Sequence, residues 1–487
     1  MTLLEGTTPP SLLKNNNNNN NKNNNKDLKE FHVAPMMNVT FREFRYFMRL
    51  LSKHATLWTE MVVDDTIVHT DSLDYHLGFD RAVESPIICQ IGGNHDEYAA
   101  AITRTVIHEY GYDEINLNAG CPSHRVSSER AFGAALMNDI DKAVAMLQAM
   151  QEGLPEESAG KVSIKLRIGV DDCDDLEWTT QLIARLSTVC RRFYVHARKV
   201  HTEGLDPAQN RRIPPLHYPR VYALCRRFPD CEFWINGGIM TVEQAIDVCY
   251  GVSSPREELS LPSSSSTTNN ESYQGLVPLG HGPIPCATCQ QPNGSCVTPP
   301  LGPAPINLRG CLVGRAVMDD PMRFAVLDTD FYGAPANPSR NRRQVLEAYA
   351  DFLAQLYPRR CGDCFETNGT LVTTRHPGIK PVKDYYCGYC EEGKEERPTT
   401  RKAPPQLVHR HIVGRALKPV QGVFCGIAGA SKPWRRLLQQ AMNDKVLMNC
   451  GPAFLLQHAM KKLEDGHVER ICAILDEPFG KRSDDER

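Results

Sequence analysis

The sequence contains no long hydrophobic run, and no apolar segment approaches the ~20 residues that are needed to span a bilayer. Its first residues also lack the charged start, apolar core and small-residue cleavage site of a secretory signal. We therefore expect a cytoplasmic protein, with an organellar presequence of atypical composition left open. In a cytoplasmic setting the 18 cysteines favour thiols or metal ligands over a disulfide framework.

An excess of one charge is also lacking, because the formal net charge is only −3. Any nucleic-acid binding must therefore rest on a local basic patch. A dinucleotide-binding fingerprint is missing as well. What is present, 41% hydrophobic and 23% charged residues over 487 positions, is typical of a globular protein with two or three domains.

Two low-complexity segments interrupt the chain. Residues 1–30 include an Asn tract that cannot build a packed core, so we expect a disordered arm there. A segment rich in Ser, Pro and Gly at about 252–306 predicts a disordered insert on the surface of a fold.

Between these segments, short apolar strands alternate with helix-period stretches such as 41–53, 96–110 and 175–189. This alternation predicts a parallel sheet, and eight units around one core favour an α/β fold of the (β/α)8 TIM-barrel type over residues 31–335. A doubly wound α/β sheet is the alternative. The predicted strands are 31–36, 57–62, 86–92, 114–120, 161–169, 193–199, 232–238 and 310–316.

Residues 336–487 lose the strand signals and predict a helical C-terminal domain, with helix-period stretches at 340–357, 409–427 and 433–442. A Cys-rich insert at about 361–390 interrupts it with two C-x2-C pairs. This spacing favours a structural zinc site over free thiols. The ligands would be Cys361, Cys364, Cys387 and Cys390. A third group, Cys286, Cys289 and Cys296, lacks an obvious fourth ligand.

In a barrel the functional site forms at the carboxyl ends of the strands. Each predicted strand delivers a polar or soft side chain, or a Gly-rich turn, to that end. The set is Met36, Met37, Glu60, Gln90, Asn118, Cys121, Lys165, Arg167, His196, Arg198, Asn236, Gly237, Gly238, Gly314 and Arg315.

Two of these turns suggest a phosphate site. Gly237 and Gly238 follow the seventh strand, and Gly314 and Arg315 follow the eighth. Loops after these two strands are where such barrels usually hold a phosphate. The alternative for the first pair is a plain tight turn.

Lys165 alternates inward with Arg167 along the fifth strand. A lysine inside a barrel is costly without an anionic partner. A flavin ring would supply one, because reduced flavin carries negative charge near N1 and O2. An ion pair with Glu60 is the alternative. For Cys121, which stands on a Gly-Cys-Pro break, a buried thiol, a metal ligand and a reactive group all remain open.

The motifs together resemble the flavin-dependent tRNA-dihydrouridine synthases, and most of all their A-type subfamily. The matching strings are "APMMNVT", "TEMV", "QIGG", "NLNAGCPSHRV", "IKLRIGVDD", "HARKVHTEGLDPAQNRRIPPLHYPRVY", "INGGI" and "VGRA". The resemblance covers residues 31–250, resumes at 309–333 and returns at "GVFCGIAGASKPWRRLL". The C-x2-C pairs depart from the A-type pattern.

The resemblance implies an FMN-binding barrel followed by a tRNA-binding helical domain, with NADPH as the electron donor. Cys121 would be the catalytic acid. The cofactor-binding residues would be Pro35, Met36, Met37, Gln90, Lys165, His196, Asn236, Gly237, Gly238, Gly314 and Arg315.

The implied reaction is the reduction of D-loop uridine, at position 20 and also 20a, to 5,6-dihydrouridine. Hydride from FMNH2 goes to C6 of the uracil, and Cys121 protonates C5. A thiol with the ordinary pKa of ~8.5 is protonated at neutral pH, so it can serve as an acid without activation if it is placed over C5.

A base inside folded RNA must be turned out to reach such a site. We expect tRNA or substrate contacts around the barrel opening and on the C-terminal helices, where basic residues cluster. A solvated helix face is the alternative for any single charge. The predicted residues are Asn118, Arg125, Arg198, Lys199, Asn210, Arg211, Arg435 and Arg436.

Two other functions remain open. One is a flavin-dependent barrel oxidoreductase that acts on a free small molecule. The other is a tRNA-binding protein without catalysis. We favour a monomer with no membrane partner.

Overall fold

The structure, a computed structural model, describes residues 28–122, 132–154, 158, 160–251, 303–357, 405–444, 447–448, 450–465 and 469–480. The Asn tract, the predicted insert up to residue 302, Arg125 and all four predicted zinc ligands lie outside these residues. The disorder predicted for the first two segments, the tRNA contact of Arg125 and the zinc site therefore stay predictions. Within the described residues no helix is long and apolar enough to cross a membrane.

Eight parallel strands form one sheet in the order β1-β8-β7-β6-β5-β4-β3-β2. A parallel bridge between His32 and Thr56 joins the two edges, with Val33 N donating to Thr56 O over 2.9 Å. The sheet therefore closes on itself. The strands are β1 (Glu30–Val33), β2 (Leu57–Val63), β3 (Ile87–Gly92), β4 (Glu114–Asn118), β5 (Val162–Arg167), β6 (Arg192–His196), β7 (Glu232–Asn236) and β8 (Leu308–Val313).

This ring confirms the predicted (β/α)8 barrel and excludes the doubly wound alternative, in which the sheet edges stay apart. All eight predicted strands are present. Several of them end earlier than predicted, as β4 does at Asn118 and β6 at His196. The apolar pattern continues there into buried residues beyond the strand ends, such as Ala119 and Ala197, whose N–H groups still donate to Lys165 O and Asn236 O at 2.8 Å.

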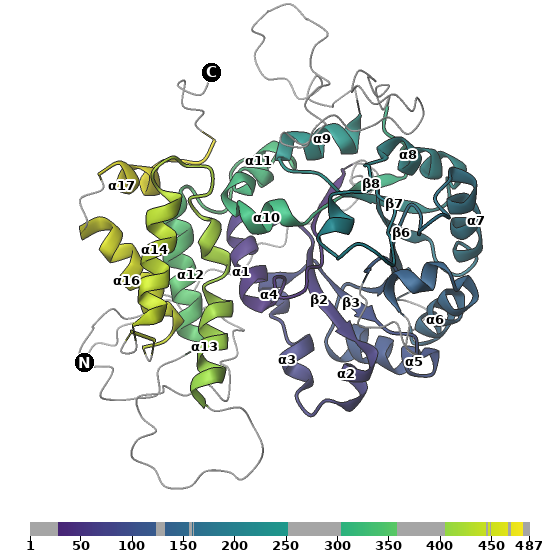
Figure 1. The fold of residues 1–487 in the computed structure, drawn as a ribbon, viewed down its shortest axis with the longest axis horizontal. Helices are drawn as coiled ribbons and strands as arrows, with labels where there is room; N and C mark the ends of the chain where they lie inside the picture. The colour runs from purple at the N-terminus through teal and green to yellow at the C-terminus, as the bar shows by residue number, and fades with distance from the viewer. Residues whose placement is uncertain are drawn as a thin grey trace, which may run out of the picture.

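Helices surround the barrel on its outer face (Figure 1). Outward strand residues such as Ile115 and Leu117 pack against them, and Asp139, Asp175 and Thr241 cap three helix starts with side-chain oxygens. The helices are α1 (Arg42–Leu51), α2 (Asp64–His69), α3 (Leu73–Leu77), α4 (Arg81–Glu84), α5 (Asp96–Arg104) with the π turn η1 (Thr105–Glu109), α6 (Ile140–Glu152), α7 (Leu176–Leu186), α8 (Tyr218–Arg227), α9 (Val242–Tyr250), α10 (Arg315–Asp319) and α11 (Leu327–Asp330).

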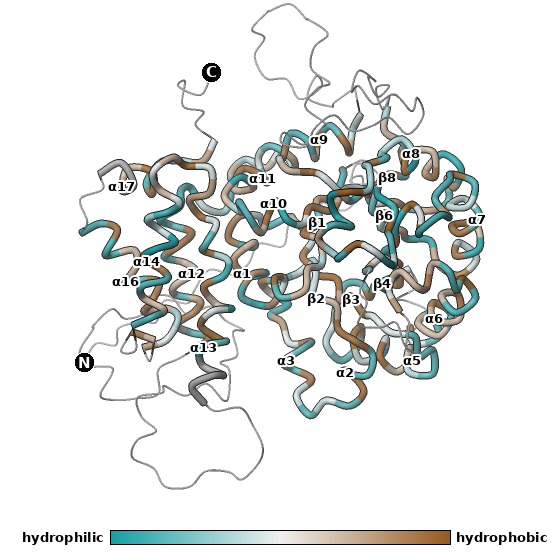
Figure 2. Tube along the Cα trace, viewed as in Figure 1, coloured by the Kyte–Doolittle hydropathy of each residue, from teal (hydrophilic) through white to brown (hydrophobic). Residues whose placement is uncertain are grey.

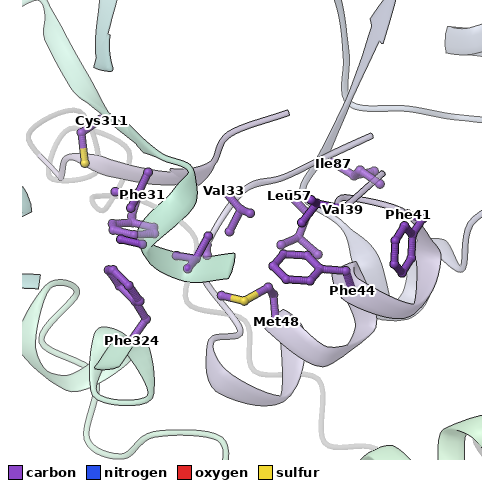
Figure 3. Close-up of a cluster of buried hydrophobic side chains, with 14 of the residues drawn as sticks. Phe31, Val33, Val39, Phe41, Phe44, Met48, Leu57, Ile87, Cys311 and Phe324 are labelled. Atoms are coloured by element: carbon purple, nitrogen blue, oxygen red, sulfur yellow. The ribbon is translucent and has the colours of Figure 1, made fainter. Parts of the chain in front are cut away.

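The main core lies between the strands and these helices. Figure 3 shows one part of it, where Phe44 and Met48 of α1 pack toward Val33 and Leu57. A second, smaller cluster fills the barrel interior and includes Trp58, Tyr194 and Trp234. The barrel is therefore a packed core rather than a pore.

The C-terminal helices form a bundle beside α1 and α10 (Figure 1). Brown apolar segments of these helices face one another in Figure 2. Trp434 is buried there and donates from Nε1 to Val420 O at 2.7 Å. The bundle contains α12 (Arg342–Leu356), α13 (Pro405–Ala416), α14 (Ser431–Asn443), α16 (Pro452–Asp465) and α17 (Glu469–Asp476).

These helices confirm the predicted helical C-terminal region, with one correction. The stretch 409–427 is not one helix, because α13 ends at Ala416 and a 3-10 turn, η10 (Pro419–Gly422), follows. Pro419 explains the break, since proline has no N–H with which to continue the helical hydrogen bonds.

Candidate active site

The carboxyl ends of the strands and their following loops form one end of the barrel, which we call the mouth. Inward-facing polar residues stand side by side around it. Asn118 is the register partner of Lys165, Arg167 of His196, and His196 of Asn236. Gln90 joins them through a hydrogen bond from Asn118 Nδ2 to its Oε1 at 3.0 Å. The structure thus brings the predicted strand-end residues into one site.

Cys121 is partly buried in the loop after β4. Its backbone N–H and that of Gly120 both donate to Asn118 Oδ1, at 3.0 and 3.1 Å. Its carbonyl accepts a hydrogen bond from Ala134 N at 3.0 Å. The approach is so close that a Cβ on Gly133, where φ is +70°, would lie 2.7 Å from Cys121 O. The backbone at Cys121 is therefore held on both sides.

Arg167 holds the same loop from the barrel side. It is buried, and its Nε donates to Gly120 O at 2.9 Å. Its Nη1 donates to Lys199 O and Asn210 O, at 3.0 and 3.1 Å. Arg167 therefore ties the loop after β4 to the loop after β6. Strand alternation predicted its inward direction, but carbonyl partners from two distant loops left no signal in the sequence.

Lys165 faces the mouth without a carboxylate partner. Burial, and then the Arg167 guanidinium, lower its pKa to about 7, whereas a Cys121 thiolate acts in the opposite direction. The alternative ion pair with Glu60 does not form in the described part of the chain, and Glu60 Oε1 instead accepts a hydrogen bond from Asn38 N. Lys165 therefore lies near Cys121, and no described carboxylate forms an ion pair with it.

His196 is neutral in this setting. Burial lowers its pKa well below 6.5, and the neighbouring cations Arg167 and Lys165 lower it further. A Cβ on Gly237 would lie 2.8 Å from His196 Nε2, so the ring packs directly on the turn after β7. A neutral imidazole can both donate and accept one hydrogen bond.

The turn after β7 requires glycine. Gly237 has φ +116° and Gly238 has φ +73°, and a Cβ on either would collide with His196 or Leu216. Tyr218 donates its hydroxyl to Gly237 O at 2.5 Å, and Asn236 Nδ2 donates to Leu312 O at 2.9 Å. The turn is thus fixed at the mouth and packed against His196 and Leu216.

Three arginines, which we call the arginine cluster, lie beside this turn. Arg315 donates from Nη2 to Arg211 O at 3.1 Å, and Arg198 donates from Nη1 to Pro214 O. Burial lowers the pKa of Arg198 to about 10 and also lowers that of Arg315. The buried Nε atoms of Arg198 and Arg211 have no hydrogen-bond partner within the described residues. Such donors and crowded positive charge fit a phosphate group.

The loop after β1 forms another part of the rim. Met36 is half-buried, and its Sδ lies 3.6 Å from the position of a Cβ on Gly314. Met37, in contrast, is 53% exposed. Pro35 precedes both, and Asn38 adopts φ +58° in the same loop. The predicted residues Pro35, Met36 and Met37 thus lie on the side where β1 meets β8.

Several predicted tRNA-binding residues already have internal partners. Asn210 is fully buried, where it accepts from His201 N at 2.7 Å and donates to His201 O and Leu205 O. Lys199 pairs with Asp174 at 3.0 Å. Asn118 retains one Nδ2 hydrogen without a partner among the described residues. Arg435 and Arg436, in contrast, are exposed on α14.

The sequence reading missed one cluster of ionisable residues at the mouth. Asp64, Asp65 and His95 follow β2 and β3 and offer ligand atoms within 4.8 Å of one another. Asp64 Oδ2 already accepts hydrogen bonds from Asn94 N, His95 N and His95 Nδ1. The buried carboxylate therefore ties the loops after β2 and β3 together. The repeated Asp after the second strand was the only signal for it.

A family profile described as "Dihydrouridine synthase (Dus)" matches residues 32–276, about half of the chain. This match covers the barrel up to β7 and α9 and includes every mouth residue before β8.

Curated relatives match the same region and bear the name tRNA-dihydrouridine(20/20a) synthase. The protein of Pasteurella multocida is 43% identical over 237 residues, which is 48% of this chain and 70% of the relative. That of Vibrio cholerae is 43% identical over 217 residues, 44% of this chain and 63% of the relative. That of Yersinia pestis is 38% identical over 257 residues, 52% and 72% respectively. The chain thus spans 63 to 72% of these relatives' lengths.

Proposed function

This chain belongs to the dihydrouridine synthase family, and from that premise we propose that it reduces uridine in tRNA to 5,6-dihydrouridine. The observation that carries the proposal is the position of Cys121 at the barrel mouth, fixed by Asn118 and beside Lys165. The names of the relatives support position 20 and also 20a of the tRNA as the target.

The mouth fits FMN as the cofactor. The arginine cluster and the turn at Gly237 and Gly238 would hold its phosphate, since the buried Nε atoms of Arg198 and Arg211 have no hydrogen-bond partner in the described part of the chain. Lys165 and Gln90 would meet the ring edge, with His196, Asn236, Gly314 and the loop of Met36 around it. When bound, FMN supplies the hydride for the uracil ring, and we propose NADPH as the source of the electrons.

The chain's own contribution is to place a proton donor. Cys121 gives its thiol proton to C5 of the uracil, and the hydrogen bonds at Gly120 and Cys121 keep the thiol in one place. Lys165 provides positive charge for an anionic ring near it, and this raises its own pKa from about 7 on binding. Neutral His196 orients a ring by hydrogen bonding without adding charge.

For tRNA we propose a basic surface that runs from the mouth onto the C-terminal helices. Lys418 donates from Nζ to Asn38 O in the loop after β1, so the helices contact the rim directly. Asp319 lies at the end of α10, the helix that begins with Arg315. Burial raises the pKa of Asp319, and the positive charge of Arg435 opposes that rise. Phosphate contacts along this surface would make affinity depend on salt.

The test is the substitution Cys121→Ala in the full-length protein. We expect the flavin to stay bound and dihydrouridine formation on tRNA to fall about a thousandfold, because the only proposed donor to C5 is removed. Cys173→Ala is the matched control, since Cys173 is exposed in the loop after β5 and should leave the activity unchanged. Wild-type turnover in Cys121→Ala would refute the assignment.

The alternative function, reduction of a free small molecule, has a separate test. The purified chain should act on tRNA and show about a thousandfold lower kcat/KM on free uridine, because free uridine lacks the phosphate contacts of the basic surface. Equal kcat/KM on the two would favour the small-molecule function. Binding of tRNA by a protein that carries no flavin would favour a binding protein instead.

We also propose zinc at Cys361, Cys364, Cys387 and Cys390, which rests on their spacing alone. Metal analysis of the purified protein should find about one zinc per chain. The double substitution Cys361→Ser and Cys387→Ser should remove it. A stably folded protein without zinc would contradict the proposal.

A further inference from the structure

A continuous chain of polar side chains runs through the barrel interior from the mouth to the opposite end. We call it the polar chain. Asn118 Nδ2 donates to Gln90 Oε1 at 3.0 Å, and Gln90 Nε2 donates to Asn116 Oδ1 at 2.9 Å. Asn116 Nδ2 donates to Ser163 Oγ at 2.8 Å, and Ser163 Oγ donates to Glu114 Oε1 at 2.5 Å. All five side chains are buried.

The direction of the polar chain is set at both ends. At the mouth, Asn118 Oδ1 faces the N–H groups of Gly120 and Cys121, which can only donate. At the other end stands a carboxylate, which when ionised can only accept. Each amide and the hydroxyl therefore donate toward Glu114 and accept from the side of the mouth. No single amide can turn around without opposing two donors or two acceptors.

Arg192 favours the ionised form of Glu114, which this direction needs. Its Nη2 lies 2.8 Å from Glu114 Oε2, and it also pairs with Glu232 at 3.4 Å. Burial raises the pKa of Glu114, and Arg192 opposes that rise. A protonated Glu114 could donate to Ser163 and would then allow the amides to reverse.

From these contacts we propose that Glu114, Ser163 and Asn116 are positioning residues for the reaction at Cys121. They act through Gln90 and Asn118, and none of the three touches the mouth itself. The inference rests on the proposed function, since it explains how the proton donor stays in place. It adds three residues from the barrel interior to those that determine turnover.

The physical consequence is a coupling between the interior and the thiol. If the polar chain is cut, the direction of the Asn118 carboxamide is set from the loop side alone, and a rotation that turns its NH2 group toward the two N–H groups of the loop costs less free energy. Buried donors would then oppose one another, and the loop at Cys121 must shift. Displacement of a reacting group by about 1 Å can cost about a hundredfold in rate.

The experiment cuts the polar chain at Ser163. Ser163→Ala removes its two hydrogen bonds within the polar chain, and Ser163→Thr keeps the hydroxyl. Thr179→Val is the matched control, because it deletes a buried hydroxyl that bonds Ile168 O at 2.7 Å outside the polar chain. Two readouts are measured in the full-length protein: kcat and KM on tRNA, and the rate of iodoacetamide alkylation of the Cys121 peptide relative to the Cys173 peptide.

For Ser163→Ala we expect kcat to fall at least about tenfold with little change in KM for tRNA, because the phosphate contacts of the basic surface are untouched. The relative alkylation rate of Cys121 should change by at least about threefold, because its surroundings shift. Ser163→Thr should restore both values to within about twofold of wild type, and Thr179→Val should leave both unchanged.

Wild-type values in Ser163→Ala, or equal changes in Thr179→Val, would overturn the inference. If Ser163→Ala does not fold, Ser163→Cys replaces it, since the thiol keeps the volume and weakens the hydrogen bonds; an unchanged Cys121 alkylation rate there would also overturn it. A wild-type protein that forms no dihydrouridine would refute the proposed function instead. The alkylation readout would still decide whether the polar chain positions Cys121.

Discussion

The barrel mouth and the contact between α1 and the C-terminal helices both bury charge, but they balance it in opposite ways. At the contact, Arg415 of α13 meets Glu43 of α1 with Nη2 and Oε2 3.0 Å apart. Glu43 is fully buried and also accepts from Tyr357 OH. Burial alone would lower the pKa of Arg415, yet Glu43 raises it above its ordinary value. The two buried charges at this contact therefore neutralise each other.

At the mouth, the described residues include buried cations that form no ion pair. Within the described residues no ion pair involves Lys165, Arg167, Arg198 or Arg315, and the pKa of each is lowered, first by burial. Cations held in this way are costly until an anion arrives. In this protein a buried ion pair marks a structural contact between helices. Buried cations that form no ion pair within the described residues mark the place where ligands bind.

Breaking the buried pair should have the largest effect. Arg415→Met leaves Glu43 buried without a counter-ion and should lower the free energy of unfolding by about 3–5 kcal/mol. Thermal or denaturant unfolding measures the loss. Arg343→Met is the control, because Arg343 binds Asp476 and Glu464 at the surface and should cost only about 0–1 kcal/mol. Equal losses of unfolding free energy in the two variants would show that the buried pair stabilises the fold no more than the surface pairs do.

Removing a cation from the mouth should instead raise the free energy of unfolding. Unfolded lysine has a pKa near 10.5 and folded Lys165 one of about 7, so the folded state binds fewer protons between these values. Stability of the flavin-free protein should therefore rise as the pH rises from about 7 to about 10.5. Lys165→Met should stabilise it by about 4 kcal/mol at pH 7, and the gain should vanish near pH 10.5.

Unfolding of the flavin-free protein across that pH range checks this prediction. Lys432→Met, on the exposed face of α14, should show no such pH-dependent gain. A Lys165→Met variant that is less stable than wild type at pH 7 would mean that Lys165 has a partner after all.

The smallest change in stability is expected at the arginine cluster. Arg315→Gln should alter the unfolding free energy by less than about 1 kcal/mol, because Arg315 is half-exposed. Its affinity for FMN should nevertheless fall about tenfold or more, since a charged donor to the phosphate is lost. Flavin titration measures this. Arg323→Gln, paired with Asp320 away from the cluster, should leave flavin affinity unchanged.

Much of this arrangement could be predicted before the structure. Strand alternation placed Gln90, Asn118 and Lys165 on the inner face of the barrel, because side chains in a strand alternate with period two. The parallel order then brought their ends to one mouth. The resemblance in the motifs around Cys121 led to the proposed reaction. The predictions of the barrel and of the inward strand faces succeeded because they depend on local pattern and on a fold with few ways to close.

Other features depended on contacts between distant parts of the chain. The pair Glu43–Arg415 joins residues 372 positions apart, and Arg167 joins loops after two different strands. Asn210 fits the pattern of a tRNA-binding residue, yet its side chain forms its hydrogen bonds within its own loop. Sequence spacing gives no measure of such partners, because the same side chain can turn to solvent or to a carbonyl.

The sequence by itself determined the barrel, the inward face of each strand and the position of a lone cysteine at a strand end, since hydrophobic period and turn residues act locally. Only the tertiary structure decided which buried charges are neutralised. The mouth keeps its cations because no carboxylate of the described residues forms an ion pair with them, whereas α13 brings Arg415 onto Glu43. Coulomb attraction acts over a few ångströms, so only the closed fold determines which charges meet.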